Sequence, residues 1–307
     1  MTANQPIQAI EGATPRLSAV VHEGARRLLS GAIDSGRLDA ELLLGHVLNM
    51  SRAQLVVAAN RPLSPEQCEQ FEIVLSRRLR REPLAYITGL QEFWSLDFCV
   101  TPDVLIPRPE TERLVEIALK LAAELHAERP LRILDLGTGS GAIAIALASE
   151  LPGAEIWATD FSRSALSVAR INAQQNGVAE RMQFYYGDLF TAIRDIEKPF
   201  HLIVSNPPYI RGDEISQLEP EVSRWEPRGA LDGGIDGLDY YRRIAAEAFD
   251  YLMPNGATVV EIGADMASSV TALFANAGFL DMKIYQDYSG KDRVVVVRNR
   301  AAFLNSV

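Results

Sequence analysis

The residues best suited to take part in a reaction are Asn206-Pro207-Pro208-Tyr209, which follow the apolar run from His201 to Ser205. The side-chain carbonyl of Asn206 and the main-chain carbonyl of Pro207 are two neighbouring hydrogen-bond acceptors. Proline has no backbone donor and fixes φ, so these acceptors stay rigid and unshared. Tyr209 adds an aromatic face that could lie against a flat group. Such a set could hold both N–H groups of a planar amide or amino-aromatic nitrogen while its lone pair is aimed at an electrophile. Because Asn and Pro are also common turn residues, the tetrapeptide alone fits a strand-ending turn equally well.

A glycine-rich turn upstream favours the chemical interpretation. Leu131 to Leu136 predicts a buried strand that contains Asp135, and Ala142 to Ser149 predicts a helix. Between them lies Gly137-Thr138-Gly139-Ser140-Gly141. A strand, a glycine turn and a helix form the first unit of a nucleotide-binding parallel sheet. The spacing Gly-x-Gly-x-Gly departs from the dinucleotide fingerprint Gly-x-Gly-x-x-Gly.

Three further strands are predicted to end in polar residues. The run from Glu155 to Thr159 ends in Asp160, where an acidic side chain could accept hydrogen bonds from both ribose hydroxyls. Met182 to Tyr186 is followed by Gly187 and Asp188, and the fourth strand carries Asn206. Open α/β sheets bind ligands at the carboxyl ends of their strands, so these residues predict a binding site there.

S-adenosylmethionine fits this site better than a dinucleotide. A nicotinamide enzyme would also need groups that handle a hydride, and the sequence has no evident Tyr-x-x-x-Lys or His–Asp arrangement. Asp135 suits a ligand with a cationic end, such as an ammonium or sulfonium group, and would repel a pyrophosphate.

With these motifs the chain resembles the release factor glutamine methyltransferases. The motif Ile106-Pro107-Arg108-Pro109-Glu110-Thr111-Glu112 joined to Asn206-Pro207-Pro208-Tyr209 is specific to that family, whereas either part alone is much less so. The stretches that carry the resemblance, these two motifs included, are Gly89 to Trp94, Val104 to Glu112, Ile133 to Ala148, Ser205 to Ile210, Ala230 to Leu238 and Asp292 to Val295.

The resemblance implies the residues of a site. It places S-adenosylmethionine on Asp135, Gly137, Thr138, Gly139, Ser140, Gly141, Asp160, Asp188, Leu189 and Asn206. It places the substrate on Asn206, Pro207, Pro208 and Tyr209, with Arg108, Glu110 and Thr111 in a loop that closes over the site. Asn206, Pro207 and Tyr209 are the expected catalytic residues. One departure is visible, because Met266 stands where family members often carry glutamine after Glu-Ile-Gly, which in this chain is Glu261-Ile262-Gly263.

The implied reaction transfers a methyl group from S-adenosylmethionine to the side-chain nitrogen N5 of the glutamine in the Gly-Gly-Gln motif of peptide chain release factors. S-adenosylhomocysteine is the second product, and the modification would tune translation termination. Two alternatives stay open. An adenine or guanine amino group is also planar and would suit the same tetrapeptide, but a nucleic-acid methyltransferase should carry a basic groove. A non-catalytic S-adenosylmethionine-binding partner of the translation machinery could dispense with the tetrapeptide.

Composition limits the partners. The 307 residues carry a formal net charge of −10, which argues against stable nucleic-acid binding because that relies on clustered Lys and Arg. Cys68 and Cys99 predict no disulfide framework and fit a reducing cytoplasm. Four scattered histidines lack zinc-site spacing, so no metal is expected. Neither a membrane span nor a signal peptide is predicted, and a monomer is the default expectation.

The chain divides into four predicted parts. These are a disordered lead over residues 1–16, a helical bundle that binds the release factor over 17–85, a hairpin linker over 86–106 and the methyltransferase domain over 107–307. In the bundle, helix-spaced residues from Ala40 to Leu48 and the cap Ser64-Pro65-Glu66-Gln67 predict helices. Trp94 and Phe98 in the linker are expected to pack between the domains. The catalytic domain is predicted to be an α/β Rossmann-like doubly wound sheet, with Lys283 to Tyr285 and Arg293 to Val297 as its terminal antiparallel pair.

Two segments carry further predictions. Arg77, Arg78, Arg80 and Arg81 could contact the release factor or ribosomal RNA, but a solvated helix face is the preferred interpretation. The region from Arg211 to Asp239 is predicted to be a long loop that recognises the substrate, because loops of this length in compact domains are usually functional.

Overall fold

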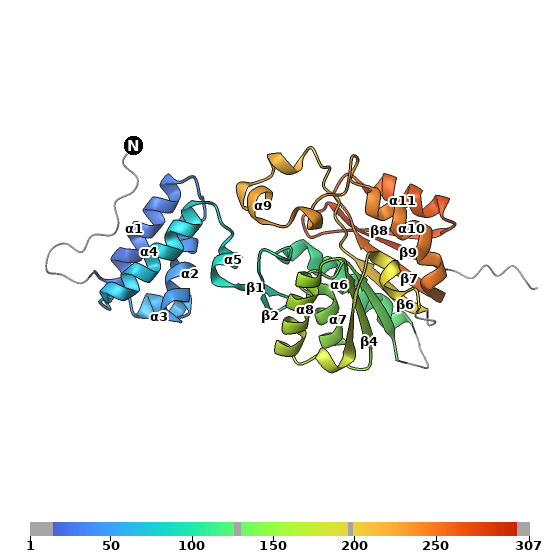
Figure 1. The fold of residues 1–307 in the computed structure, drawn as a ribbon, viewed down its shortest axis with the longest axis horizontal. Coiled ribbons are helices and arrows are strands. Elements are labelled where there is room, and N and C mark those ends of the chain that lie inside the picture. Colours follow the sequence, from blue (N-terminus) through green and yellow to red (C-terminus); the bar gives the residue numbers. More distant parts are fainter. Residues whose placement is uncertain (1–14, 126–129, 196–198, 300–307) are drawn as a thin grey trace, which may run out of the picture. The chain divides into compact units, whose positions relative to one another are not determined.

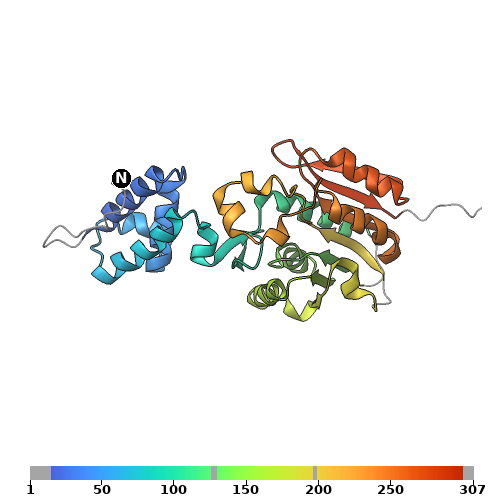
Figure 2. The ribbon, with the colours of Figure 1, turned by 45° about the horizontal axis from the view of Figure 1, so that its top comes forward.

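The computed structural model describes residues 15–125, 130–195 and 199–299. They form two compact units (Figures 1 and 2). The first unit runs to Gly89 and includes a separate segment, Glu219–Trp225, and the second contains Leu90–Leu218 and the chain from Glu226 onward. Most of the predicted lead lies outside the described residues, while Arg16 forms an isolated bridge with Pro62.

The first unit is helical, as predicted. Its helices are α1 (Leu17–Ser30), α2 (Gly36–Leu48), α3 (Arg52–Val57), α4 (Pro65–Leu79), α5 (Leu84–Thr88) and the detached α9 (Pro220–Trp225). Leu28, Leu43, Leu44 and Phe71 are fully buried in its core. Ser64 caps α4 as the sequence predicts, since its hydroxyl accepts from the Gln67 main chain and the Gln67 side chain accepts from the Ser64 main chain, with Pro65 in the first turn.

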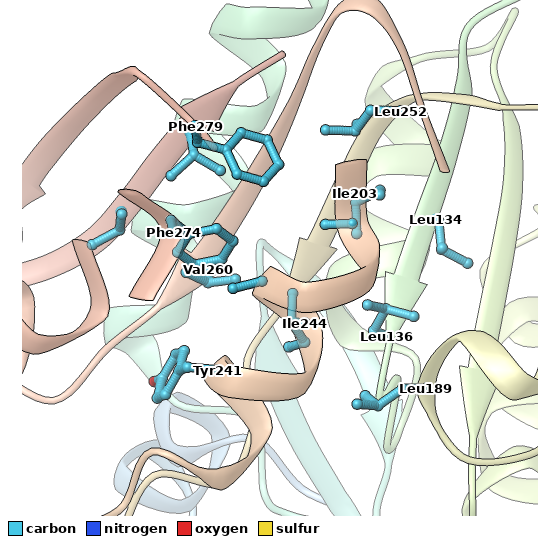
Figure 3. Close-up of a cluster of buried hydrophobic side chains, with 14 of the residues drawn as sticks. Leu134, Leu136, Leu189, Ile203, Tyr241, Ile244, Leu252, Val260, Phe274 and Phe279 are labelled. Atoms are coloured by element: carbon cyan, nitrogen blue, oxygen red, sulfur yellow. The ribbon is translucent and has the colours of Figure 1, made fainter. Parts of the chain in front are cut away.

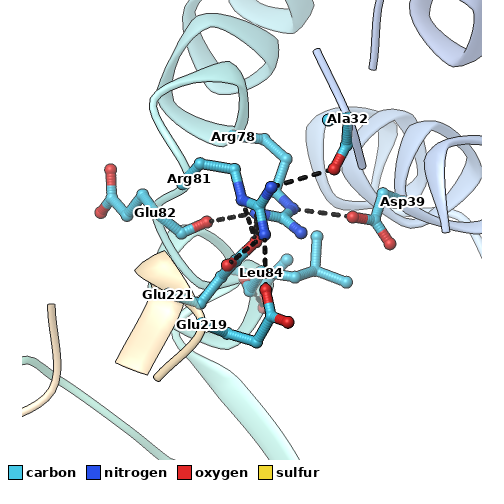
Figure 4. Close-up of polar contacts among 9 residues, drawn as sticks. Ala32, Asp39, Arg78, Arg81, Glu82, Leu84, Glu219 and Glu221 are labelled. Carbon is cyan, nitrogen blue, oxygen red and sulfur yellow. Dashed lines mark hydrogen bonds and ion pairs between the residues drawn. The ribbon is translucent and has the colours of Figure 1, made fainter. Parts of the chain in front are cut away.

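The four arginines at the end of α4 were predicted to form a solvated helix face. That prediction was wrong for three of them, because these three form ion pairs and are buried or partly buried. Arg78 is buried and donates to Asp39 Oδ2 and to Glu221 Oε1, each at 2.7 Å (Figure 4). Arg81 also binds Glu221, through Nε at 2.7 Å. Arg77 pairs with Glu82, and only Arg80 is exposed. Sequence could not reveal this, because Glu221 lies about 140 residues away in α9.

A hairpin opens the second unit. Its strands, β1 (Leu90–Phe93) and β2 (Leu96–Cys99), are antiparallel, and Phe93 and Phe98 meet edge to face inside it. The hairpin starts later than predicted, because α5 occupies residues 84–88. It belongs with the catalytic unit: Trp94 donates through its main chain to Glu112 and through Nε1 to Glu150. Asn172 additionally exchanges two hydrogen bonds with the Cys99 main chain. The packing of Trp94 and Phe98 between domains stays a prediction.

A seven-stranded sheet forms the centre of this unit, in the order β5-β4-β3-β6-β7-β9-β8. The parallel strands are β3 (Arg132–Leu136), β4 (Glu155–Asp160), β5 (Met182–Tyr186), β6 (Phe200–Ser205) and β7 (Leu252–Glu261). The last pair, β8 (Asp281–Gln286) and β9 (Asp292–Arg298), is antiparallel, as predicted. The α/β Rossmann-like fold class is therefore confirmed.

Helices cover both faces of the sheet. One layer contains α6 (Glu112–Glu124), α7 (Ala142–Glu150) and α8 (Arg163–Gln175), and the other contains α10 (Asp239–Tyr251) and α11 (Ala267–Asn276). Between the sheet and the second layer lies an apolar core that includes Leu134, Ile203, Ile244, Val260 and Phe274 (Figure 3). This packing fixes the strand ends that carry the polar residues.

Short helices interrupt the predicted long loop between β6 and α10. They are η4 (Ile215–Gln217), α9 (Pro220–Trp225) and η5 (Arg228–Ala230). The second unit has three further short helices. η1 (Pro109–Thr111) precedes α6, η2 (Ala179–Arg181) precedes β5, and η3 (Leu189–Ile193) follows β5. No helix within the described ranges is long and apolar enough to cross a membrane.

Candidate active site

A cavity of about 210 Å³ lies at the carboxyl ends of the parallel strands. Eight of its lining residues are ones that the sequence predicts: Gly137, Gly139, Asp160, Asp188, Leu189, Asn206, Pro207 and Pro208. They come from the carboxyl ends of β3, β4, β5 and β6 and from the segments that follow these strands. The structure therefore brings together residues that are up to about 70 positions apart in the chain.

The glycine turn forms one wall of the cavity. Gly137 and Gly139 adopt left-handed backbone angles, with φ of 71° and 56°. A Cβ atom on either would meet no atom within 4 Å, so both face open space. Gly141 differs, because its φ is 85° and a Cβ there would lie 2.9 Å from Ile145 and 3.2 Å from Ala169. Gly141 therefore permits helix packing, whereas the first two glycines leave room for a ligand.

Asp160 ends β4 and links the turn to the cavity. Its Oδ2 accepts from the Gly139 main chain at 2.9 Å, and its Oδ1 accepts from the Ser162 main chain at 2.8 Å. Burial raises the pKa of this carboxyl, and the backbone hydrogen bonds from Ser162, Gly139 and Phe161 oppose the shift. Each oxygen keeps a lone pair, so the carboxylate can still accept from two vicinal hydroxyls.

Asp135 lies behind the turn rather than on the cavity wall. It is fully buried, and its Oδ2 accepts from the Thr138 hydroxyl at 2.6 Å. Its Oδ1 has no hydrogen-bond partner among the described residues. Burial raises the pKa of Asp135 to about 7, and the Thr138 hydrogen bond acts in the opposite direction. The carboxylate can act on a cationic ligand through its field.

Asp188 and Leu189, which follow β5, also line the cavity. The Asp188 side chain caps η3, and its Oδ2 accepts from Arg243 at 2.6 Å. Leu189 is buried with a φ of 48°. Gly187 precedes them because a Cβ there would lie 2.7 Å from the Ala192 Cα.

Asn206 directly follows β6, which is the neighbour of β3, the strand that leads into the glycine turn. The Ser205 hydroxyl donates to the Leu136 carbonyl at 2.7 Å and so ties β6 to β3. Asn206 Nδ2 donates to the Thr111 Oγ1 at 3.2 Å. Asn206 lines the cavity together with Pro207 and Pro208, which supports the predicted clustering of these residues.

Several predicted site residues do not belong to the cavity wall. Tyr209 packs partly against the apolar core, and burial raises the pKa of its hydroxyl to about 12. Thr138, Ser140 and Thr111 are buried, and Glu110 is exposed. For these residues direct contact with a ligand stays a prediction.

Arg108 has a structural partner. Its guanidinium binds Glu226, whose other carboxylate oxygen accepts from the Ile106 main chain at 3.2 Å. The Glu226 carboxyl is almost completely buried, and burial raises its pKa against the effect of Arg108. This pair holds the segment before η1 to the segment that starts at Pro227, which lines the cavity.

Sequence reasoning missed the other lining residues. Phe161 is half exposed and directly follows Asp160. Its position next to a residue that is predicted to bind the ligand could have indicated that it lines the cavity. Tyr240 lies in α10, and no sequence pattern pointed to it. The remaining missed residues are Asp103, Val104, Leu105, Leu136, Ser162, Ala165, Ser205, Pro227, Gly229 and Ala230.

Comparison of the chain with known proteins identifies its family. Residues 19–89 match the PrmC N-terminal domain, and residues 116–219 match the methyltransferase small domain. The release factor glutamine methyltransferase of Geobacter sulfurreducens is 45% identical over 268 residues, which cover 87% of this chain and 91% of that protein. The one from Rhodospirillum rubrum is 42% identical over 297 residues, covering 97% and 89%.

The chain belongs to the release factor glutamine methyltransferases. It is therefore an enzyme that methylates a release factor glutamine, with S-adenosylmethionine as the methyl donor. Solved structures agree on the fold alone. The hMettl16 catalytic domain, solved with a 3'UTR hairpin, has a TM-score of 0.56 at 12% identity and covers 78% of this chain and 82% of its own. A methyltransferase from Pyrococcus furiosus has a TM-score of 0.50 at 17% identity, covering 73% and 98%.

The residues of this methyltransferase fit its cofactor. The open glycine turn, the acceptor pair of Asp160 and the buried charge of Asp135 suit a ligand that approaches the glycine backbone and carries a ribose and a cationic end. No group of three or more His, Cys, Asp or Glu side chains that could hold a metal ion occurs in the described part of the chain.

Proposed function

We propose that Asn206 and the main-chain carbonyl of Pro207 hold the side-chain amide of the glutamine in a Gly-Gly-Gln motif, and that its N5 nitrogen receives the methyl group. The observation that carries the proposal is the position of Asn206, Pro207 and Pro208 on the wall of the cavity, next to Gly137 and Gly139. One cavity can therefore hold both the methyl donor and the acceptor amide.

The carbonyl oxygens of Asn206 and Pro207 would orient the substrate amide. A primary amide has two N–H groups, and two rigid carbonyl oxygens can bind both of them. Positive charge develops on the nitrogen as it attacks in line, so each hydrogen bond that an N–H group donates to a carbonyl oxygen becomes stronger at that moment. Holding the two reactants in line contributes about 7–11 kcal/mol in favourable cases.

S-adenosylmethionine supplies an electrophilic methyl group when bound, and the sulfur keeps the electron pair of the broken S–C bond. The cationic amide that remains is strongly acidic, so its proton can pass to water without a protein base. The chain's own residues hold the ligand: Gly137, Gly139 and Asp160 the ribose side, Asp188 and Leu189 the adenine, and Asp135 the methionine end through its field.

The first unit is proposed to bind the release factor, with the segment from Arg108 to Thr111 closing on the substrate. We further propose a cytoplasmic monomer without stable nucleic-acid binding. The net charge of −10 supports the last point, since a polyanion would be repelled. Light scattering of the purified protein and a shift assay with ribosomal RNA test the oligomeric state and the nucleic-acid binding.

Methyl transfer from labelled S-adenosylmethionine tests the proposed substrate. The enzyme is offered a release factor, the same factor with Gln→Ala in its Gly-Gly-Gln motif, and unmodified DNA or ribosomal RNA in separate reactions. Label on the unaltered factor alone is expected. Equal label on the Gln→Ala factor would contradict the glutamine site, and label on nucleic acid alone would replace the substrate class.

A further inference from the structure

The loop from Asp232 to Leu238 packs against the main chain of the tetrapeptide, and the proposed reaction does not use it directly. The two segments meet in an isolated parallel bridge between Ile210 and Asp232. The Ile210 amide donates to the Leu231 carbonyl at 3.0 Å, and the Gly233 amide donates to the Ile210 carbonyl at 2.8 Å. The residue that directly follows the tetrapeptide is therefore held by both of its polar main-chain groups.

Two glycines of this loop approach the tetrapeptide closely. A Cβ atom on Gly233 would lie 2.8 Å from the Pro208 oxygen and 2.8 Å from the Tyr209 Cα. A Cβ atom on Gly237, whose φ is 76°, would lie 2.5 Å from the Tyr209 oxygen. Cβ atoms in proteins essentially never come within 3.0 Å of another such atom, so neither position has room for a side chain. Main chain therefore packs directly on main chain at Pro208 and Tyr209.

The loop itself is anchored at both ends. Asp232 Oδ1 accepts from the Gly234 amide at 3.0 Å, and Asp232 Oδ2 accepts from Arg228 Nη2 on η5 at 3.0 Å. The Gly233 carbonyl accepts from the Asp239 amide at 3.1 Å, where α10 begins. Because α10 packs into the apolar core, the loop rests on a fixed support.

A fixed Pro208 also fixes the direction of the Pro207 carbonyl. That carbonyl belongs to the planar peptide group that ends at the Pro208 Cα. The only rotation between this plane and the Pro208 carbonyl that could turn it is the torsion φ of Pro208, which the pyrrolidine ring holds at about −65°. When the loop sets the Pro208 carbonyl, the ring therefore sets the Pro207 carbonyl with it.

We propose that Gly233 and Gly237 are positioning residues, and that their loop fixes the Pro207 carbonyl in the direction in which it accepts from the substrate amide. This role rests on the proposed function of Pro207. No side chain of the loop has to touch the substrate, because the loop acts through the main chain of Pro208. A displaced carbonyl would weaken one of the two hydrogen bonds that hold the amide nitrogen in line, and a misplacement of about 1 Å can lower a rate about 100-fold.

Gly233→Ala displaces the supported main chain. The added methyl group has to push Pro208 and Tyr209 away, so kcat with a release factor is expected to fall about tenfold or more. The Kd for S-adenosylhomocysteine and the KM for the release factor are expected to stay within about threefold, because neither binding step depends on the exact direction of one carbonyl.

Gly256→Ala is the matched control for crowding. A Cβ atom on Gly256, which lies in β7, would be 3.0 Å from the His201 oxygen and 3.1 Å from the Phe200 oxygen, at the start of β6 and away from the tetrapeptide. Neither Gly233 nor Gly256 has a positive φ, so both substitutions act through crowding alone. Gly256→Ala is expected to keep kcat within about threefold of wild type. An equal loss of kcat in the two variants, or a folded Gly233→Ala with wild-type kcat, would overturn the positioning role.

Asp232→Ala loosens the loop without crowding it, and it decides the question if Gly233→Ala does not fold. The Gly234 amide loses its acceptor, so kcat is expected to fall about threefold to tenfold. Asp232→Asn keeps a side-chain oxygen that can accept from Gly234 and should retain most of kcat. Wild-type kcat in Asp232→Ala, or a loss that Asp232→Asn matches, would contradict the support.

A measurement without substrate keeps this role distinct from the proposed function. Pro207 and Pro208 are the only two adjacent prolines in the 307 residues. Protein in which only proline carries NMR-active carbon and nitrogen isotopes therefore gives one signal in a spectrum that correlates each carbonyl carbon with the nitrogen of the next residue. That signal is the Pro207 carbonyl.

The Pro207 signal is expected to shift in Gly233→Ala and Asp232→Ala and to keep its position in Gly256→Ala. An unmoved signal in the first two variants would contradict the support by the loop. A shift in a protein that leaves release factors unlabelled would instead refute the proposed substrate alone.

Discussion

Arg78 in the first unit and two carboxylates in the second unit are buried with different sets of partners. In the first unit, Arg78 is 7% exposed and binds two carboxylates, Asp39 and Glu221, at 2.7 Å each. In the second, Asp135 and Glu261 are buried at 0% and 2%, and each has one carboxylate oxygen for which the described residues provide no partner. Burial raises the pKa of both to about 7.

The difference separates structural charge from functional charge. A buried ion pair offsets the cost of desolvation with its own partners, and it contributes to the arrangement of the chain around it. A buried carboxylate without a full set of partners is a cost to stability, and such groups cluster at functional sites. The ion pairs of Arg78 connect α2, α4 and α9, whereas Asp135 lies against the glycine turn and Glu261 ends β7.

The largest expected effect comes from breaking the paired charge. Arg78→Ala leaves Asp39 buried without its cation, so the first unit should lose about 3–5 kcal/mol of unfolding free energy. Urea denaturation with hydrogen exchange on residues 17–89 measures it. Arg80→Ala, on the same helix end but exposed, is the control and should change stability by less than about 0.5 kcal/mol. Equal losses in the two variants would mean that the pair does not stabilise the unit.

Replacing the buried carboxylate of Asp135 with a neutral amide is expected to increase the free energy of unfolding. Asp135 keeps its proton in the folded protein up to about pH 7 but loses it near its ordinary pKa when unfolded, so wild-type stability falls as pH rises between those values. Asp135→Asn removes this loss and should be roughly 1–3 kcal/mol more stable than wild type above about pH 7, with little difference near about pH 4.

The same substitution should weaken cofactor binding, because the field of the carboxylate is lost. Thermal denaturation from about pH 4 to about pH 8 and calorimetry with S-adenosylhomocysteine measure the two effects, with the exposed Asp195→Asn as control. A variant Asp135→Asn that is less stable than wild type at the alkaline end would show that the charge is structural.

The sequence predicted the second unit better than the first. The strands near Leu131, Glu155, Met182 and His201 were predictable because their apolar runs end in polar residues at one edge of a parallel sheet. Gly137, Asp160 and Asn206 could be placed together for the same reason.

Long-range partners could not be predicted. The partner of Arg78 is on α9, and only the fold brings that short helix to α4. Phe161, Tyr240 and Pro227 line the cavity through tertiary packing, and no periodicity marks them. The hydrogen bond from Asn206 to Thr111 likewise joins two segments that lie far apart in the chain.

A smaller effect is expected at Arg81. Its pairs with Glu219 and Glu221 are more exposed, since the Arg81 side chain is 21% and the Glu219 side chain is 77% accessible. Arg81→Ala should therefore cost about 0.5–1 kcal/mol in the same urea experiment, well below Arg78→Ala. A loss as large as that of Arg78→Ala would show that burial does not rank these ion pairs.

The central claim is that Asn206 acts on the acceptor amide and not on the cofactor. It is tested most directly by measuring, in Asn206→Ala, the rate of methyl transfer to a release factor and the Kd for S-adenosylhomocysteine. Turnover is expected to fall about 100-fold or more, as when one preorganised polar contact to the transition state is removed. The Kd should change by less than about threefold, a difference below about 1 kcal/mol. An equal loss of turnover and cofactor affinity would place Asn206 in the cofactor site and contradict the account.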